Sequence, residues 1–379
     1  MMADDEQRAA RWLRAWDGQG IHRTGTPGDE AGADWLLAEA AALGAAPVVE
    51  AFPFDRIDPV ESYLEIDGTR IEGVPVFDAP PTDGVTGVLG QAGRGAAIAV
   101  AELPPRVVYT QAWRDLRSEP SQRGLVVLCR GEHPGLGLLN AEQFNAPYGA
   151  PAIHLPTEAR DVVLTAAGRG AVVRLVARAD RTRTTARNVV VTLPGQDRSR
   201  PPVVVMTPRS SWWQSTSERG GGLVCWLVTL RALLAHPPGC DVVLTANTGH
   251  ELGHTGLDAF QERRPGWDRP AGAVWVHYGA NIGARGGRLS IMSASDDLRA
   301  IMADSLRSSG QAADELAPAT VTPSGETRDI HRVGGRYVTL VGSNPLFHLP
   351  SDRWPDAVDV PVIARLAAGA AGAVVGLTR

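Results

Sequence analysis

The pattern of hydrophobic and polar positions divides the chain into three regions. In residues 4–45, apolar side chains such as Leu13 and Trp16 recur at the spacing of one helix face, which predicts amphipathic helices. A Gly-Thr-Pro-Gly turn precedes the second helix, which we expect over residues 31–43 and ending at Gly44. The chain is therefore predicted to begin with two helices.

The second region, from residue 48 to about residue 185, consists of short alternating apolar runs. Runs such as GAAIAVAEL, GLVVLCRG and GAVVRLVARA are separated by clusters of Gly, Pro and Asp. Short strands separated by turn residues are typical of a mostly β module. One segment, LLNAEQFNAPYG, departs from this pattern, and we expect a short helix in it.

In the third region, from residue 187 onward, apolar strand-like runs alternate with helical segments. The strand-like run PPVVVMTPRS, for example, is followed by GGGLVCWLVTLRALLAH, which has one strongly apolar helix face. Such alternation predicts a mainly parallel sheet covered by helices on both faces. The sequence thus predicts an α/β domain over residues 1–50 and 186–379, interrupted by a mostly β domain over residues 51–185.

Composition narrows the classes of function. The chain has 379 residues and a net charge of -5, without the basic excess that nucleic-acid binding requires. We find no apolar run of about 18 residues and no signal-peptide pattern, so we expect a cytoplasmic protein that binds no membrane. All 37 basic residues are arginines, which excludes lysine Schiff-base chemistry and a lysine-dependent phosphate loop. Three cysteines do not form a disulfide framework.

Histidines gather at the ends of the predicted strands. DVVLTAN ends just before His250, AVWV ends at His277, and RYVTLVGS precedes His348. In open α/β sheets, ligands bind beyond the carboxyl ends of the strands. We therefore expect these three side chains to share one pocket.

A second local signal is the segment His250-Glu251-Leu252-Gly253-His254, which matches the HExxH pattern of zinc proteases. In those proteases the motif lies inside a helix, so that both histidines face one metal ion. Here it follows a strand-like run and a Thr-Gly turn. We therefore expect the motif at the start of a helix and do not interpret it as that protease site.

The order of motifs resembles the co-catalytic zinc aminopeptidase family, whose relatives include glutamate carboxypeptidase II, glutaminyl cyclase and the non-catalytic transferrin receptor ectodomain. The resemblance rests on a strand ending in TPRS, SERGGG opening a helix, GHELGHTG after a strand, and PLFHLPSDRW near the end. It covers nearly the whole chain and implies a three-layer aminopeptidase-like domain with a mainly parallel central sheet. The β module resembles the protease-associated domain that many members carry as an insert.

The resemblance also implies a metal site with altered ligands. The family's bridging acid aligns with Glu218, its ligand glutamate with Glu251 and its last histidine with His348, whereas its first histidine aligns with Pro208, which has no side-chain donor. Two carboxylates and an imidazole suit one zinc ion with a position open to water, and Fe, Ni, Mn or Cu would also suit a histidine-rich set. His277, in place of an acid, would be a fourth ligand, help Glu218 hold a second ion, or contact substrate.

The remaining roles follow the same alignment. His250 stands where the family has its general base, and a histidine suits proton transfer at neutral pH; capping the helix or binding the metal are the alternatives. We expect His254 and Asp352 to support the ligands by hydrogen bonds from behind. The candidates for contact with substrate are Arg209, Trp212, Trp213, Tyr278, Glu326 and His331.

Two classes of function are compatible with these residues. The first is a metal-dependent hydrolase of an amide or related C–N bond in a small amino-acid-like substrate or short peptide, with cyclisation or elimination as related reactions. The second is a non-catalytic pseudopeptidase that acts as a binding or interaction protein. Replacement of acids by histidines, which retain proton-active groups, favours the enzyme. The sequence leaves open whether the chain forms a homo-oligomer.

Overall fold

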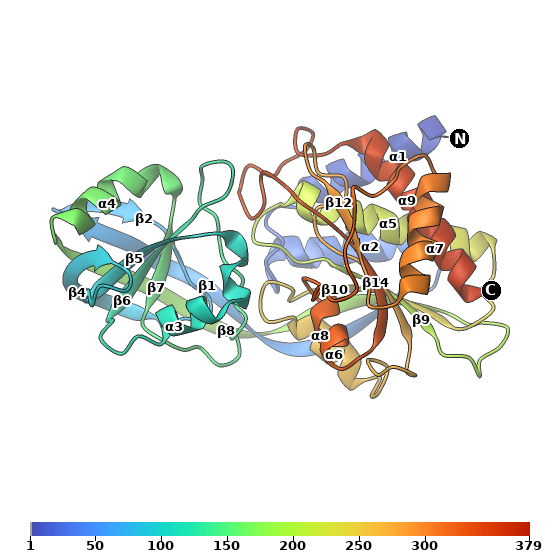
Figure 1. The fold of residues 1–379 in the computed structure, drawn as a ribbon, viewed down its shortest axis with the longest axis horizontal. Coiled ribbons are helices and arrows are strands. Elements are labelled where there is room, and N and C mark those ends of the chain that lie inside the picture. The colour runs from blue at the N-terminus through green and yellow to red at the C-terminus, as the bar shows by residue number, and fades with distance from the viewer. Residues whose placement is uncertain (1) are drawn as a thin grey trace.

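The structure of this chain, a computed structural model that describes residues 2–379, has two lobes of unequal size (Figure 1). The larger lobe contains both ends of the chain. It begins with α1 (Met2–Asp17) and α2 (Pro27–Ala42), close to where the sequence predicts two helices. Pro27 occupies the first position of α2, where its missing N–H has no intrahelical partner to lose.

A mostly parallel sheet forms the core of the larger lobe. Four neighbouring strands are parallel, in the order β10, β9, β11, β14, and their valines and leucines are buried on both faces. The antiparallel strand β12 follows β14, and the short β13 pairs with β12. The bounds are β9 (Val203–Pro208), β10 (Val242–Asn247), β11 (Val274–Tyr278), β12 (Leu289–Met292), β13 (Glu315–Leu316) and β14 (Arg336–Gly342).

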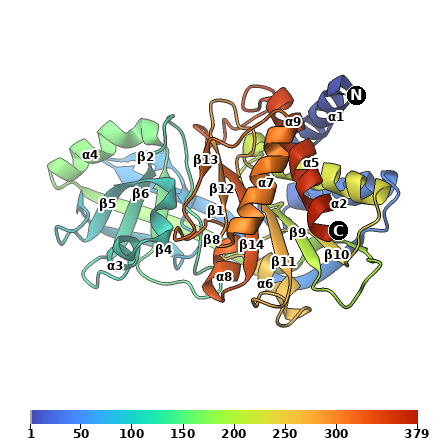
Figure 2. The ribbon, with the colours of Figure 1, turned by 45° about the vertical axis from the view of Figure 1, so that its right-hand side comes forward.

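Helices cover both faces of this sheet, as the alternating pattern predicts. One hydrophobic cluster joins the sheet to α1, α2, α5, α7 and α9, and α9 lies against both α5 and α7 (Figure 2). A second cluster joins the opposite face to α6 and α8 through residues such as Phe260 and Ile330. The bounds are α5 (Thr216–Ala235), α6 (Thr255–Glu262), α7 (Asp296–Ser308), α8 (Thr327–Arg332) and α9 (Val360–Thr378). The predicted α/β class with a mainly parallel sheet is confirmed.

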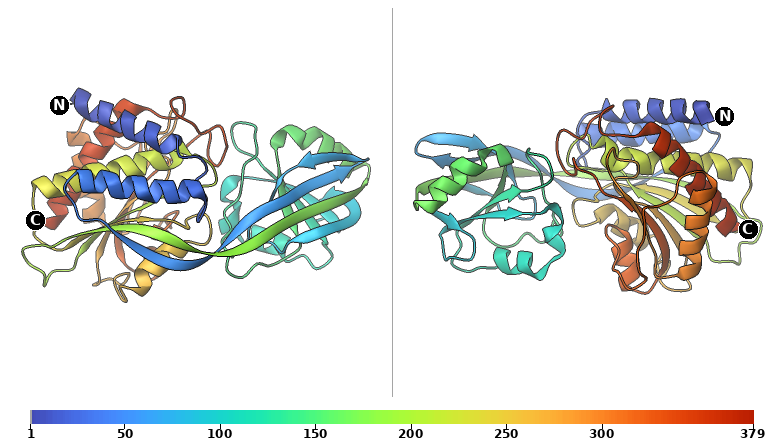
Figure 3. Two further views of the ribbon diagram at one scale, coloured as in Figure 1. Left: turned by 180° about the vertical axis from the view of Figure 1, so that it is seen from behind. Right: turned by 45° about the horizontal axis from the view of Figure 1, so that its top comes forward.

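Two long antiparallel strands connect the lobes. β1 (Val48–Ile66) has 19 residues and β8 (Val172–Leu193) has 22, so both are much longer than the short strands that the sequence predicts. They pair along almost their whole length and run from one lobe into the other (Figure 3). β8 also pairs with β10 in the larger lobe and with β4 in the smaller one, which joins the two sheets.

The smaller lobe is mostly β and has hydrophobic clusters of its own. Its core pairs β4, β5, β6 and β7 in that order, next to short helical segments. The predicted boundaries of an inserted domain, residues 51–185, fall inside β1 and β8 and remain a prediction. The bounds are β2 (Thr69–Glu72), β3 (Val74–Pro75), β4 (Thr82–Gln91), β5 (Ile98–Leu103), η1 (Pro105–Tyr109), α3 (Gln111–Arg117), β6 (Gly124–Cys129), β7 (Ala152–Leu155), η2 (Thr157–Ala159) and α4 (Arg160–Gly168).

Two local predictions are wrong. The segment 138–149, LLNAEQFNAPYG, forms turns instead of a helix, because tertiary contacts such as the hydrogen bond from Ala141 N–H to the Glu251 carbonyl fix its backbone. The helix expected to start at the HExxH pattern starts at Thr255, because His254 has a left-handed φ of +57°.

One helix, α9, is long and apolar enough to cross a membrane by length and composition. Its residues Ile363, Leu366 and Val374 are buried against the other helices of the larger lobe. An apolar helix is expected wherever a helix is packed on several sides, so this finding agrees with a place in the protein core.

Close packing of α5 yields a first prediction. A Cβ on Gly221 would lie 1.8 Å from the Ile282 carbonyl oxygen, whereas a Cβ on Gly376 in α9 would meet no atom within 4 Å. We expect Gly221→Ala to destabilise the protein by about 1–3 kcal/mol or more through overpacking. The control Gly376→Ala is expected to be neutral or to stabilise by up to about 1 kcal/mol. Urea denaturation measures both, and equal effects of the two variants would contradict this packing.

Candidate functional site

Three histidines that the sequence places at strand ends lie around one small cavity. His250 follows β10, His277 lies near the end of β11, and His348 follows β14. They line a cavity of about 30 Å³ together with Asn140 and Tyr109, and all three side chains are buried. The carboxyl ends of parallel strands share one edge of the sheet, which brings these three side chains together.

A tight turn after β10 holds His250. Gly249 has a φ of +81°, and a Cβ there would lie 2.1 Å from Thr255 Oγ1, so the turn requires glycine. The His250 N–H donates to Ser210 Oγ at 3.0 Å, while the ring Nδ1 has no hydrogen-bond partner among the described residues. Burial, followed by the positive charge of Arg219, lowers the pKa of His250 well below its ordinary value, so the ring is uncharged at neutral pH.

Behind the histidines, Arg219 lies between two glutamates. Its Nη2 forms an ion pair with Glu218 Oε1 at 2.8 Å and donates a hydrogen bond to Glu251 Oε1. Its Nε donates to the Ser210 carbonyl at 2.5 Å. All three charged side chains are buried. Burial alone would raise the pKa of Glu218, but the positive charge of Arg219 and the neighbouring His348 lower it overall. Both carboxylates therefore already have a cation.

The orientation of the His348 ring is set by contacts with segments other than Arg219 and its two glutamates. Its Nδ1 donates to the Leu138 carbonyl at 2.7 Å, which turns Nε2 toward Glu218 Oε1 at 3.4 Å. The backbone at His348 is left-handed, with a φ of +63°, and its carbonyl accepts a hydrogen bond from Trp213 Nε1 at 2.9 Å. Contacts from two distant segments thus fix the ring.

His277 belongs to a separate pair. Its Nδ1 lies 2.7 Å from Thr339 Oγ1 on the neighbouring strand, and its Nε2 lies 3.6 Å from Glu326 Oε2. Neither oxygen of the buried Glu326 has a hydrogen-bond partner among the described residues. His277 and His348 therefore each face one carboxylate, and the two carboxylates differ.

His254 forms a third pair, with Asp329. Its Nδ1 lies 2.6 Å from Asp329 Oδ2, and its ring centroid lies 5.1 Å from that of His250. Burial alone would lower the pKa of His254, but the hydrogen bond and charge of Asp329 raise it above its ordinary value. Burial would likewise raise the pKa of Asp329, which the contact with His254 lowers.

The predicted metal ligands do not fit a metal ion in this arrangement. Glu218 and Glu251 are both committed to Arg219, and His277 faces Glu326. Within residues 2–379, no three His, Cys, Asp or Glu side chains are grouped so that they could hold one ion. A guanidinium thus lies between two of the expected ligands, and a single zinc ion on Glu218, Glu251 and His348, with His277 in support, stays a prediction.

Several residues expected to contact substrate lie away from the cavity. Arg209 is fully buried and pairs with Asp29 of α2 at 2.8 Å. Trp212 packs on Phe77 and donates from Nε1 to Asn140 Oδ1 at 3.2 Å. The hydroxyl of Tyr278 lies 2.8 Å from Thr229 Oγ1 in α5, on the other side of the sheet from the cavity. These side chains form the surrounding core.

Two further candidates, Asp352 and His331, hold neighbouring segments in place. Asp352 accepts the backbone N–H groups of Ser217 and Glu218 at 2.8 and 3.0 Å, which fixes the start of α5. Burial raises the pKa of Asp352 to about 7. His331 contacts the Tyr337 hydroxyl at 3.0 Å and does not line the cavity.

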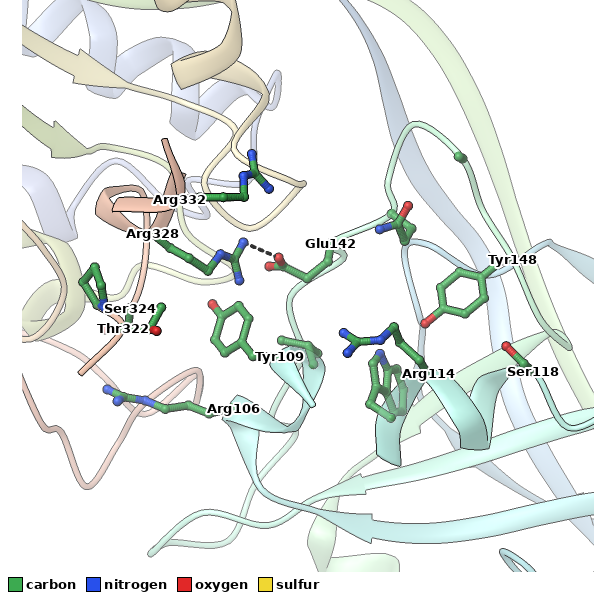
Figure 4. A pocket seen from close by; sticks show the side chains of 15 residues that line it. Arg106, Tyr109, Arg114, Ser118, Glu142, Tyr148, Thr322, Ser324, Arg328 and Arg332 are labelled. Atoms are coloured by element: carbon green, nitrogen blue, oxygen red, sulfur yellow. Dashed lines mark hydrogen bonds and ion pairs between the residues drawn. The ribbon is translucent and has the colours of Figure 1, made fainter. Parts of the chain in front are cut away.

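A larger cleft of about 820 Å³ adjoins the small cavity. Arg106, Tyr109 and Ser324 line both spaces. The walls come from η1 and α3 of the smaller lobe and from α8 of the larger lobe, and arginines from both walls face the space between them (Figure 4).

The sequence reasoning missed the residues that give this site its charge. Arg219 stands directly beside Glu218 in SERGGG, and only its burial distinguishes it from a surface arginine. No sequence motif links three of the cleft arginines, which come from two distant parts of the chain: Arg106, Arg114 and Arg328. His254 likewise carries no signal in the sequence for its partner Asp329, which is 75 residues away.

The pair of His254 and Asp329 predicts a dependence of stability on pH. The raised pKa of His254 adds stability below about pH 6.5, which is lost as the pH rises through that pKa, and the lowered pKa of Asp329 adds stability above about pH 3.8. We expect Asp329→Asn to reduce the melting temperature most between these two pH values. Calorimetry of both proteins at pH 5 and pH 8.5 checks this, and an equal loss at both pH values would count against the pair.

No family model and no curated protein matches the chain. Among solved structures, the zinc aminopeptidase BSAP from Bacillus subtilis aligns with a TM-score of 0.80 at 16% identity, over 99% of this chain and 95% of that one. An M28 peptidase precursor from Shewanella amazonensis gives 0.73 at 15%, over 100% and 98%. An aminopeptidase from Aneurinibacillus sp. strain AM-1 gives 0.72 at 14%, over 98% and 93%. The chain therefore has the mixed α/β fold of zinc aminopeptidases, with a mostly parallel central sheet.

Proposed function

We propose that this chain binds a small amino-acid-like molecule or short peptide that carries carboxylate groups, in the cleft between the lobes. The observation that carries the proposal is the continuity of the cleft with the histidine cavity through Arg106, Tyr109 and Ser324. A cleft of about 820 Å³ has the size of pockets for small molecules. On this proposal the smaller lobe, which we interpret as an inserted protease-associated-like domain over residues 51–185, supplies one wall.

The charge of the cleft supports an anionic ligand. Its lining includes four arginines and one acidic residue, Glu142, which is already paired with Arg328 at 2.5 Å. Arg332 lies 3.4 Å from Asp329, whereas Arg106 and Arg114 have no carboxylate partner among the described residues. At least two guanidinium groups are thus available to a ligand.

The arrangement of these arginines favours carboxylates over one phosphate group. The guanidinium fork pairs with a carboxylate through two parallel hydrogen bonds. Arg106, Arg114 and Arg328 come from η1, α3 and α8, at separate points along the cleft, which suits charges spaced along an extended ligand. Tyr109 packs against Arg328, 4.5 Å from guanidinium carbon to ring centroid, and burial raises the pKa of Tyr109 to about 12, so its hydroxyl keeps its proton to donate.

A binding experiment tests this proposal. We expect the peptide Glu-Glu-Glu to bind more tightly than Ala-Ala-Ala, and Arg114→Ala to weaken its binding by about tenfold because one charge-assisted contact is lost. Isothermal titration calorimetry at two salt concentrations measures both effects. Arg160→Ala is the matched control, because Arg160 is an exposed arginine of the smaller lobe that pairs with Glu102 outside the cleft. Equal affinities for the two peptides would refute the proposal.

Hydrolysis of an amide or related C–N bond in the same ligand is a second candidate, favoured by one observation. His250 lines the cavity, and its ring Nδ1 has no hydrogen-bond partner among the described residues, which leaves this nitrogen open to exchange a proton with a water molecule. That water would add to the carbonyl carbon, and the proton would pass from His250 to the leaving nitrogen as the C–N bond breaks. The fold neighbours are zinc enzymes, but Arg219 holds the carboxylates that would bind an ion here, so we assign no step to a metal.

A variant of His250 separates the two candidates. If hydrolysis occurs, we expect His250→Ala to lower the rate of product formation by about 10²–10⁴-fold while the affinity for Glu-Glu-Glu changes little. Mass spectrometry of long incubations detects the product, and calorimetry gives the affinity. His331→Ala is the control, since His331 does not line the cavity. Wild-type protein that binds the peptide without product formation would reject hydrolysis of this peptide and leave the binding function intact.

A further inference from the structure

We infer that Arg219 is a permanent, covalently attached replacement for a metal cation: it pairs with both Glu218 and Glu251, offsets one of their two charges and keeps this site free of metal. The inference concerns the interior of the larger lobe and does not depend on the ligand proposed for the cleft. It predicts that a latent metal site appears when the guanidinium is removed.

The contacts of the guanidinium support this reading. Two carboxylates from different elements, Glu218 of α5 and Glu251 of the turn after β10, converge on the same nitrogen, Nη2. Convergence of acids from separate elements on one point is the geometry that a protein uses for a cation. The carboxylates are fully buried, so each needs a positive partner, and Arg219 is the positive group that contacts both.

The surroundings leave Arg219 no room to move aside for an ion. Its Nε is bound to the Ser210 carbonyl at 2.5 Å, and the side chain is almost fully buried. The following three glycines of α5 lie against Leu13, Ile282 and Thr207, so closely that a Cβ on any of them would approach these residues to 2.6 Å or less. The neighbouring cavity of about 30 Å³ has space for only one or two water molecules. The helix and the guanidinium are therefore fixed together.

The charges also oppose a metal ion beside Arg219. Counting Glu218, Glu251 and Arg219, the cluster carries two negative charges and one positive charge, which gives -1. A divalent ion on the same carboxylates would lie within a few ångströms of the guanidinium, in a region that water does not screen. In the present arrangement these acids and His348 do not surround one point. Without the guanidinium, the two released carboxylates would move toward the Nε2 of His348, which lies 3.4 Å from Glu218, and the three would become ligands for one ion.

The test compares zinc retention in wild type and Arg219→Ala. Both proteins are purified without chelator, incubated with zinc sulfate, desalted and measured by inductively coupled plasma mass spectrometry. We expect wild type to retain no stoichiometric zinc and Arg219→Ala to retain about one ion per chain. We also expect zinc to raise the melting temperature of Arg219→Ala and to leave that of wild type unchanged.

Arg209→Ala is the matched control. Arg209 is also fully buried and paired with an acid, Asp29 at 2.8 Å, but among residues 2–379 only one carboxylate faces it in an ion pair. We expect this variant to lose stability without gaining zinc. Zinc uptake by Arg209→Ala as well would mean that any buried carboxylate released from arginine attracts the ion, which would overturn the specific role of Arg219.

If Arg219→Ala does not fold, the zinc content of wild type still tests the inference, and a double variant separates loss of the guanidinium from loss of a ligand. Arg219→Met combined with Glu251→Gln leaves the cluster at -1, the value of the wild type, and we expect it to fold without retaining zinc. Stoichiometric zinc in wild type that is lost in Glu251→Gln would overturn the inference, and so would a folded Arg219→Ala that retains none. Neither outcome bears on peptide binding in the cleft, which calorimetry measures separately.

Discussion

The ion pairs of Arg219 with Glu218 and Glu251 constrain the centre of the larger lobe. Three buried charges are tolerated only while each has its partner, because an unpaired charge in the protein interior is strongly destabilising. These contacts tie the start of α5 to the turn after β10, and the bond from Arg219 to the Ser210 carbonyl adds the segment after β9. The positions of His250 and His348 depend on this arrangement.

The two lobes contribute unequally to the site. The larger lobe supplies the histidines and their acidic partners, whereas the smaller lobe supplies Arg106 and Arg114 on the other wall of the cleft. The continuous pairing of β1 with β8 connects the two walls, so the width of the cleft depends on two strands that are part of both sheets. Specificity for a ligand would thus arise at the junction of the two lobes. The fold itself is shared with a zinc aminopeptidase from Bacillus subtilis.

Part of the site follows from simple rules of sheet geometry. His250, His277 and His348 were expected to meet because they stand at the carboxyl ends of strands in one mainly parallel sheet, and they do line one cavity. Tyr278 shows the limit of that rule. It is the neighbour of His277 on β11, and adjacent residues of a strand point to opposite faces, so its side chain reaches Thr229 in α5 instead of the cavity.

The fold class, the order of helices and strands, and the edge of the sheet where the histidines gather could be predicted before the structure, because periodicity and strand ends are local properties of the chain. Which charges meet depends on how the chain folds in three dimensions. Arg219 is paired with the carboxylate of Glu251, 32 residues away, and Arg328 with Glu142, 186 residues away. The sequence around an arginine does not show whether its side chain is exposed to solvent or buried between two acids. Its partners come from other helices and strands, so no local sequence pattern predicts them.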